Sequence, residues 1–96
     1  MTSKFKDKIS VVIPTYNRAQ TIMRAINSVL SQTLPAFEIL VVDDGSSDGT
    51  KELLQAHGFF NKKTKALEKK YLVQENSGVS SARNLGIKNA NGDFIA

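Results

Sequence analysis

A chain of 96 residues with 41% hydrophobic and 23% charged residues has room for one soluble globular domain with a modest core. It contains no cysteine, which excludes a disulfide framework, a thiolate metal site and a cysteine nucleophile. Its formal net charge is +4 at pH 7, and no apolar run approaches the ~20 residues of a membrane span.

The first third of the chain predicts a strand followed by a helix. Residues 1–8 are polar, and we expect them to be frayed. The β-branched run Ile9–Ile13 predicts the first strand, bounded by Pro14. Apolar residues then recur at helical spacing from about Ala19 to Gln32, which predicts an amphipathic helix. Pro35 prevents its continuation.

The central stretch carries paired acids after a buried strand. Four apolar residues, Ile39–Val42, run without alternation into Asp43 and Asp44, which is typical of a parallel strand buried on both faces. A helix is expected at Thr50–Ala56. In open α/β sheets ligands bind at the carboxyl ends of the strands. The alternative is that one aspartate caps the following helix while the other is solvated.

The second half continues the alternation of strands and helices. Phe59–Lys69 has no clear period, and its lysines indicate a solvated connection rather than a nucleic-acid patch. We expect a third strand at Tyr71–Val73, a helix with a stripe of small residues at Val79–Asn89, and the start of a fourth strand at Asp93–Ala96. The order predicts an α/β fold with three α/β/α layers, a mostly parallel sheet and right-handed crossovers.

Three blocks of sequence resemble the N-terminal half of a family 2 glycosyltransferase of the GT-A fold: ISVVIPTYNRAQTI, EILVVDDGSSDGT and ENSGVSSARNLGIKNANGDFIA. The resemblance implies that residues 1–96 are the N-terminal part of a single GT-A domain, a Rossmann-like nucleotide-binding half that is a fragment and is inactive alone. The implied reaction transfers a sugar from a UDP-sugar to a hydroxyl of a glycan or lipid-linked acceptor, with inversion. Such enzymes act in polysaccharide, glycolipid or cell-envelope glycan synthesis.

The resemblance also assigns roles around a base pocket. Tyr16 would stack on the nucleobase, while Pro14 and Thr15 would shape the pocket beside it. Asp44 would accept a hydrogen bond from a base N–H, and Asp43 would mainly support the turn, although which aspartate does which stays open. The alternative for Tyr16 is packing on the rim of the core with its hydroxyl in water.

The same resemblance places further nucleotide contacts at the third helix. Arg83 would bind a carbonyl or the diphosphate with its fork of donors. Ser77 and Gly78 would present backbone N–H groups at the helix N-terminus, a generic anion site. The alternative for Arg83 is a surface ion pair with an acid such as Glu75.

The resemblance implies a divalent cation, Mg²⁺ or Mn²⁺, for the full-length enzyme. Its acidic motif is expected just beyond Ala96, so we expect neither a metal ligand nor a catalytic residue within this chain. We also expect self-association through the edge of the cut fourth strand, because unpaired backbone groups are a template for pairing. A reducing cytoplasm fits a chain without cysteine, and the full-length protein could lie at the cytoplasmic face of the membrane.

Other functions fit parts of the pattern. Asp44, Ser46 and Asp48 resemble the start of a calcium loop, but Gln55 stands where that loop needs a glutamate. Paired acids after a buried strand also resemble a response-regulator receiver. No later strand, however, offers a phospho-accepting aspartate followed by a further strand that ends in lysine. A non-catalytic α/β nucleotide-binding module is the remaining alternative.

Overall fold

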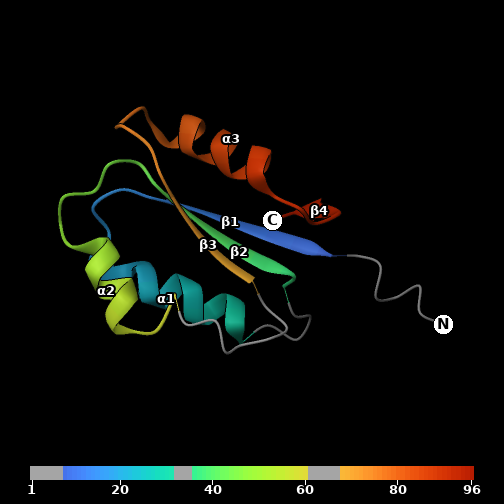
Figure 1. The fold of residues 1–96 in the computed structure, drawn as a ribbon, viewed down its shortest axis with the longest axis horizontal. Helices are drawn as coiled ribbons and strands as arrows, with labels where there is room; N and C mark the ends of the chain where they lie inside the picture. Colours follow the sequence, from blue (N-terminus) through green and yellow to red (C-terminus); the bar gives the residue numbers. More distant parts are fainter. Residues whose placement is uncertain (1–7, 32–35, 61–67) are drawn as a thin grey trace.

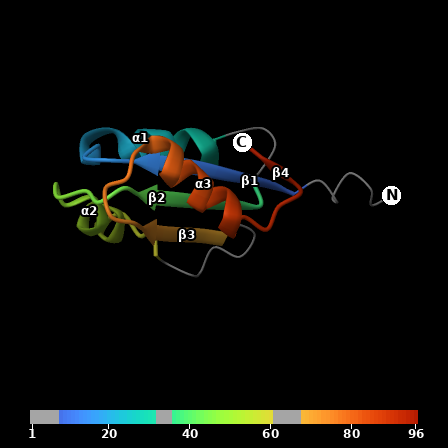
Figure 2. The same cartoon turned by 90° about the horizontal axis from the view of Figure 1, so that it is seen from above.

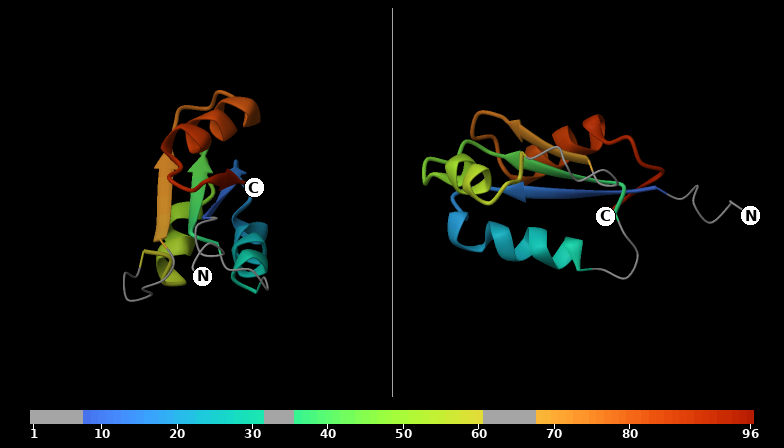
Figure 3. Two further views of the ribbon diagram at one scale, coloured as in Figure 1. Left: turned by 90° about the vertical axis from the view of Figure 1, so that its right-hand side faces the viewer. Right: turned by 60° about the horizontal axis from the view of Figure 1, so that its bottom comes forward.

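The computed structural model describes residues 8–31, 36–60 and 68–96. Strands and helices alternate throughout, and all strand pairs in the sheet are parallel. The elements in chain order are β1 (Ile9–Thr15), α1 (Ala19–Leu30), β2 (Glu38–Asp43), α2 (Thr50–Ala56), β3 (Glu68–Val73), α3 (Val79–Asn89) and β4 (Phe94–Ile95). Helices α1 and α2 cover one face of the sheet and α3 covers the other (Figures 1 and 3). The predicted three-layer α/β fold is confirmed.

The strand order β3-β2-β1-β4 explains why α3 changes face. Strands β2 and β3 are added one after the other on one side of β1, and β4 is then added on the other side of β1. Because crossovers keep one hand, a reversal of direction requires the helix to lie on the opposite face. The strand order therefore reverses at β1, and open α/β sheets bind ligands outside the carboxyl ends of the strands at such a point.

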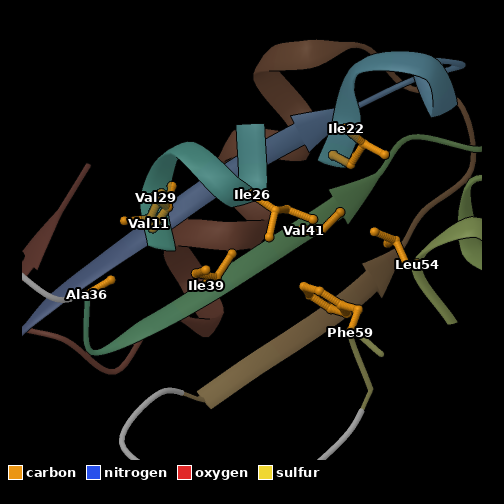
Figure 4. Close-up of a cluster of buried hydrophobic side chains, with 9 residues drawn as sticks. All are labelled: Val11, Ile22, Ile26, Val29, Ala36, Ile39, Val41, Leu54 and Phe59. Atoms are coloured by element: carbon orange, nitrogen blue, oxygen red, sulfur yellow. The ribbon is translucent and has the colours of Figure 1, made fainter. Parts of the chain in front are cut away.

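The main core lies between the sheet and the α1/α2 layer (Figure 4). Ile39 and Val41 of β2 point into it, whereas Leu40 and Val42 are equally buried on the α3 side. This two-sided burial is the reason that β2 reads as an unbroken apolar run. The core cluster comprises Val11, Ile22, Ile26, Val29, Ala36, Ile39, Val41, Leu54 and Phe59.

Helix α3 lies over β1 and β2 (Figure 2). It can approach them closely because the residues that it buries are small. Ala82 and Gly86 are its buried residues. A Cβ added at Gly86 would collide with Val12 and lie 3.1 Å from a methyl group of Val42. The predicted stripe of small residues thus sets the distance between α3 and the sheet.

Strand β1 extends through Pro14 to Thr15 and does not end at Ile13 as expected. The Val12 N–H donates to the Ala96 carbonyl oxygen at 2.9 Å, so alternate residues of β1 direct their N–H groups toward the β4 side. Pro14 lies two residues further on, and within the described residues no group on the β4 side requires its N–H. A proline is tolerated in a strand at such a position.

Strand β3 begins at Glu68, so the expected start at Tyr71 is wrong. It pairs with β2 from the register Glu38–Glu68 onward and forms an edge of the sheet, where charged side chains discourage pairing with other chains. Helix α1 ends at Leu30. The expectations for residues 1–7, for Gln32 and for the 61–67 connection lie outside the described residues. Within residues 8–31, 36–60 and 68–96, no helix is long and apolar enough to cross a membrane.

A buried carboxylate fastens the amino ends of the strands. Glu38 accepts hydrogen bonds from the Ser10 hydroxyl at 2.6 Å and the Asn91 N–H at 2.5 Å, and its other oxygen lies 2.9 Å from Lys70 Nζ. The Gly92 N–H donates to Ser10 Oγ at 2.8 Å. Burial raises the pKa of Glu38, but the contacts with Ser10, Asn91 and Lys70 outweigh it and lower the pKa. This network fixes the turn between α3 and β4.

Candidate functional site

A cavity of about 390 Å³ lies at the carboxyl end of β1, between the loops that follow β1 and β2 and the N-terminus of α3. Its position is the point of strand reversal described above. The lining residues are Pro14, Thr15, Tyr16 and Arg18 from β1 and its loop, Asp44 from the end of β2, and Asn76, Gly78, Val79 and Ala82 from the start of α3.

Thr15 lines this cavity, but its hydroxyl is buried. The residue is 5% exposed, and its Oγ1 has no hydrogen-bond partner within the part of the chain that the structure describes. A buried hydroxyl without a partner costs roughly 1–3 kcal/mol. Thr15 alternates with Val11 and Ile13, which pack on the α1/α2 side of β1, so its buried hydroxyl lies on that side and is not a contact for a molecule in the cavity.

Tyr16 places an aromatic ring at the edge of the cavity. The residue is 47% exposed and borders the cavity. An aromatic ring that is half in solvent at a cavity mouth can take a flat ligand against its face. Pro14, which also lines the cavity, directs no N–H toward it.

The Asp44 carboxylate borders the cavity but is already engaged by the loop before α3. It accepts hydrogen bonds from Gln74 Nε2 at 2.7 Å, from the Ser77 N–H at 2.7 Å and from the Gly78 N–H at 2.9 Å. These hydrogen bonds, with Gln74 the largest contributor, hold the pKa of Asp44 below its usual value against the opposing effect of burial. A carboxylate has about four acceptor positions, so one is left for a ligand donor.

The engagement of Asp44 corrects the prediction for Ser77 and Gly78. Both N–H groups were expected to receive a ligand anion, but both donate to Asp44. Helix α3 has no side-chain cap of its own at Gly78, so the carboxylate of Asp44 occupies the place of an anion there. Gly78 lines the cavity, and Ser77 does not.

Asp43 points to the opposite side of β2 from Asp44, because successive strand residues alternate in direction. It accepts a hydrogen bond from the Ser46 N–H at 2.8 Å and another from the Tyr71 hydroxyl. Burial and the bond to Asp43 together raise the pKa of Tyr71. Asp43 therefore supports the turn after β2, and it does not line the cavity.

Arg83 is exposed on α3 and does not line the cavity. It follows Val79 by one helical turn, so the two residues lie on the same face of α3. Within the described residues it forms no ion pair with Glu75 or another acid. Its contact with a nucleotide stays a prediction.

The sequence analysis missed four lining residues, of which Arg18 and Asn76 are polar. The Asn76 side chain donates to the Asp44 carbonyl oxygen at 3.2 Å, so it joins the wall of the cavity to β2. Arg18 could have been found, because it follows Tyr16 in the polar turn after the first strand. Val79 and Ala82 could not, because their exposure to the cavity depends on the rotation of α3.

The acidic and hydroxyl side chains of the calcium-loop pattern point to different partners and do not converge on one point. Asp44 turns to α3, Asp48 accepts a hydrogen bond from the Ala19 N–H at 2.9 Å, and Ser46 Oγ accepts one from the Asn17 N–H at 2.8 Å. No group of three or more His, Cys, Asp or Glu side chains in residues 8–31, 36–60 and 68–96 could hold a metal ion. The described residues do not fit a cation.

The profile of Glycosyl transferase family 2 matches residues 10–96. An uncharacterized glycosyltransferase of Rickettsia conorii is 52% identical over 89 residues, which are 93% of this chain and 14% of the relative. The putative teichuronic acid biosynthesis glycosyltransferase TuaG of Bacillus subtilis is 37% identical over 94 residues, 98% of this chain and 36% of the relative. The chain thus spans about a seventh to a third of these curated relatives.

Solved structures of GT-A glycosyltransferases share the fold. The mannosyltransferase PcManGT of Pyrobaculum calidifontis, in complex with GDP-Man and Mn²⁺, superposes with a TM-score of 0.77 at 26% identity over 92% of this chain and 26% of that one. Glucosyl-3-phosphoglycerate synthase of Mycobacterium tuberculosis, in complex with Mn²⁺, UDP and glucosyl-3-phosphoglycerate, gives a TM-score of 0.68 at 26% identity over 96% of this chain and 33% of that one.

Proposed function

Since the chain belongs to glycosyltransferase family 2, we propose that it binds the nucleotide of a UDP-sugar donor for transfer to a glycan or lipid-linked acceptor. Because the chain belongs to this family, it is not a response-regulator receiver. The similarity to TuaG, whose name refers to teichuronic acid biosynthesis, supports a role in polysaccharide or cell-envelope glycan synthesis.

One observation carries the assignment of the donor site, namely the convergence of two groups on the cavity beside β1. They are the half-exposed ring of Tyr16 and the remaining acceptor position of Asp44. A uracil offers a flat face to the ring and an N–H to a carboxylate. Stacking of a base on an aromatic side chain is worth ~1–3 kcal/mol.

In the proposed reaction an acceptor hydroxyl displaces the nucleoside diphosphate with inversion at the sugar. A bound Mg²⁺ or Mn²⁺ would neutralise the charge that develops on the departing diphosphate. The described residues form no site for that cation, and we assign them no step that involves it. Their part is to bind and orient the nucleotide, with Arg18 as the cationic side chain that borders the cavity.

Titration of UDP and of GDP into the isotopically labelled protein tests the proposal. We expect UDP to shift the amide signals of Thr15, Tyr16 and Asp44, and Tyr16→Ala to weaken binding by ~1–3 kcal/mol through lost stacking. Leu30→Ala is the control, because it removes an exposed apolar side chain that does not line the cavity. Tighter binding of GDP would favour the second candidate, a GDP-sugar, which the PcManGT complex suggests. If neither nucleotide shifts these signals, the proposal is wrong.

A further inference from the structure

Hydrogen bonds tie the loop after β1 to the loop after β2, and we propose that this tie positions two residues of the donor site. We define the loop clamp as Asn17, Ser46, Ser47 and Asp48. The inference rests on the proposed function, because the residues that the clamp holds are those that border the nucleotide cavity.

The clamp joins segments that lie about thirty residues apart in the sequence, beyond the ends of the paired strands. The Asn17 N–H donates to Ser46 Oγ and the Ser47 N–H donates to Asn17 Oδ1, both at 2.8 Å. The Ala19 N–H donates to Asp48 Oδ2 at 2.9 Å. The register of β1 with β2 ends at Thr15 and Asp43, so these bonds continue the connection where strand pairing stops.

Asp48 acts as the N-terminal cap of α1 although it belongs to a different loop. The residue at the N-cap position, Arg18, provides no side-chain cap. The second oxygen of Asp48 accepts a hydrogen bond from the Thr50 hydroxyl at 2.6 Å, which fixes the orientation of the carboxylate. The bonds from Thr50 and Ala19 lower the pKa of Asp48 against a small effect of burial, so the cap carries its charge at neutral pH.

Asn17 sets the direction of the chain at the centre of the clamp. Its φ angle is +52°, in the left-handed region that asparagine tolerates better than most residues with a side chain. Tyr16 and Arg18 flank it, and both side chains are exposed and border the cavity. Within the described residues neither side chain forms a hydrogen bond or an ion pair, so their placement depends on the backbone that the clamp holds.

The clamp therefore acts on nucleotide binding through Tyr16 and Arg18 and is a positioning element. A loop held in its binding conformation does not have to be ordered when the ligand arrives. Ordering these side chains on binding opposes association, so release of the clamp should weaken UDP binding by about tenfold.

Matched variants separate the clamp from general stability. Asp48→Ala and Asn17→Gly each remove one clamp acceptor, and glycine keeps the φ angle of residue 17 free of strain. Asp48→Asn and Asn17→Asp retain a clamp acceptor oxygen and should keep most of the loop order and nucleotide affinity that the first two variants lose. Glu52→Ala is the control for charge, because Glu52 is an exposed acid in the first turn of α2 that makes no clamp contact.

Two measurements on these variants decide the proposal. The first is the backbone order parameter of residues 16–18 from nitrogen relaxation in the protein without nucleotide. We expect it to fall from about 0.85 to below about 0.6 in Asp48→Ala and Asn17→Gly, and to stay high in the conservative variants and the control. The second is the UDP dissociation constant, which should rise about tenfold in the same two variants.

The outcomes distinguish this proposal from the proposed function. If the unsubstituted protein binds neither UDP nor GDP, the proposed function fails, and with it a role of the clamp in binding. If nucleotide binds but the order parameters of residues 16–18 do not change, the clamp does not hold the loop. If order falls and UDP affinity does not, or if only the melting temperature falls, the positioning role is overturned. Should Asp48→Ala fail to fold, Asn17→Gly and its partner Asn17→Asp give the same decision.

Discussion

Replacing Gly86 by alanine tests how closely α3 approaches the sheet, on which the shape of the cavity depends. The added Cβ would lie 3.1 Å from a methyl carbon of Val42 and closer still to Val12. Ordinary carbon contacts begin near 3.5 Å, so either α3 moves outward or Val12 changes its rotamer. A β-branched side chain is stiff at χ1, which makes the second response costly.

The expected magnitude is a balance of two effects. Overpacking a well-filled site costs about 1–3 kcal/mol. Alanine is a better helix former than glycine by about 1 kcal/mol, which offsets part of that cost. We therefore expect Gly86→Ala to lower the free energy of unfolding by about 1 kcal/mol, which is roughly 4–8 °C in melting temperature for a domain of this size. Because Gly78 and Val79 begin the same helix, UDP affinity should fall as well.

Urea and thermal unfolding, followed by far-UV circular dichroism, provide the measurement. Asn84→Ala is the matched control, since it lies on an exposed position of the same helix and should raise stability by up to about 0.7 kcal/mol. Adding Val12→Ala to Gly86→Ala should recover part of the loss, which a double-mutant cycle would register as favourable coupling. A Gly86→Ala variant as stable as Asn84→Ala would show that α3 is not held at this distance.

Two further predictions concern the ionisable groups around the sheet. Because the net effect of burial, Ser10, Asn91 and Lys70 lowers the pKa of Glu38 below 4.5, its stabilising contribution is present above about pH 4.5 and is lost as pH falls through the lower folded value. Glu38→Gln should therefore flatten the acid side of the stability profile in urea unfolding, and an unchanged profile would contradict this. Burial and Asp43 raise the pKa of Tyr71, so in Tyr16→Phe, where Tyr71 is the remaining tyrosine, the absorbance titration should show ionisation above pH 10.0. Its contribution to stability is present below pH 10.0 and is lost at higher pH, and a titration at or below that value would refute the contact.

The fold could be predicted from the sequence wherever one face or both faces of an element are buried. The unbroken run Ile39–Val42 identified β2 because both of its faces pack on helices. The end of β1 could not be predicted, because the effect of Pro14 depends on whether a neighbouring strand reaches it. The start of β3 at Glu68 could not be predicted, because β3 is an edge strand. Such a strand can carry charged residues at positions that would be apolar in the centre of a sheet.

The candidate site could be predicted in its outline. Pro14, Thr15, Tyr16 and Asp44 meet at one cavity because the carboxyl ends of neighbouring parallel strands converge. The alternation of a strand already implied that Asp43 and Asp44 point to opposite faces. Which face holds the cavity depends on the strand order and on the side that α3 takes, and neither can be read from residue types.

The segment Asp43–Asp48 connects the three loops at the carboxyl edge, which explains why so acidic a stretch contains no free carboxylate group. Helices α1 and α3 have no side-chain caps of their own. From outside, Asp48 accepts from the N–H of Ala19, the first residue of α1, and Asp44 accepts from the N–H of Gly78, the N-cap residue of α3. Each carboxylate thereby takes the position at a helix end that a ligand phosphate could otherwise occupy. A nucleotide diphosphate at this edge would have to be met by other cationic or donor groups, and Arg18 is the cation that borders the cavity. The acids thus hold the walls of the site, and Asp44, which lines the cavity where Asp43 and Asp48 do not, keeps one acceptor position for the base.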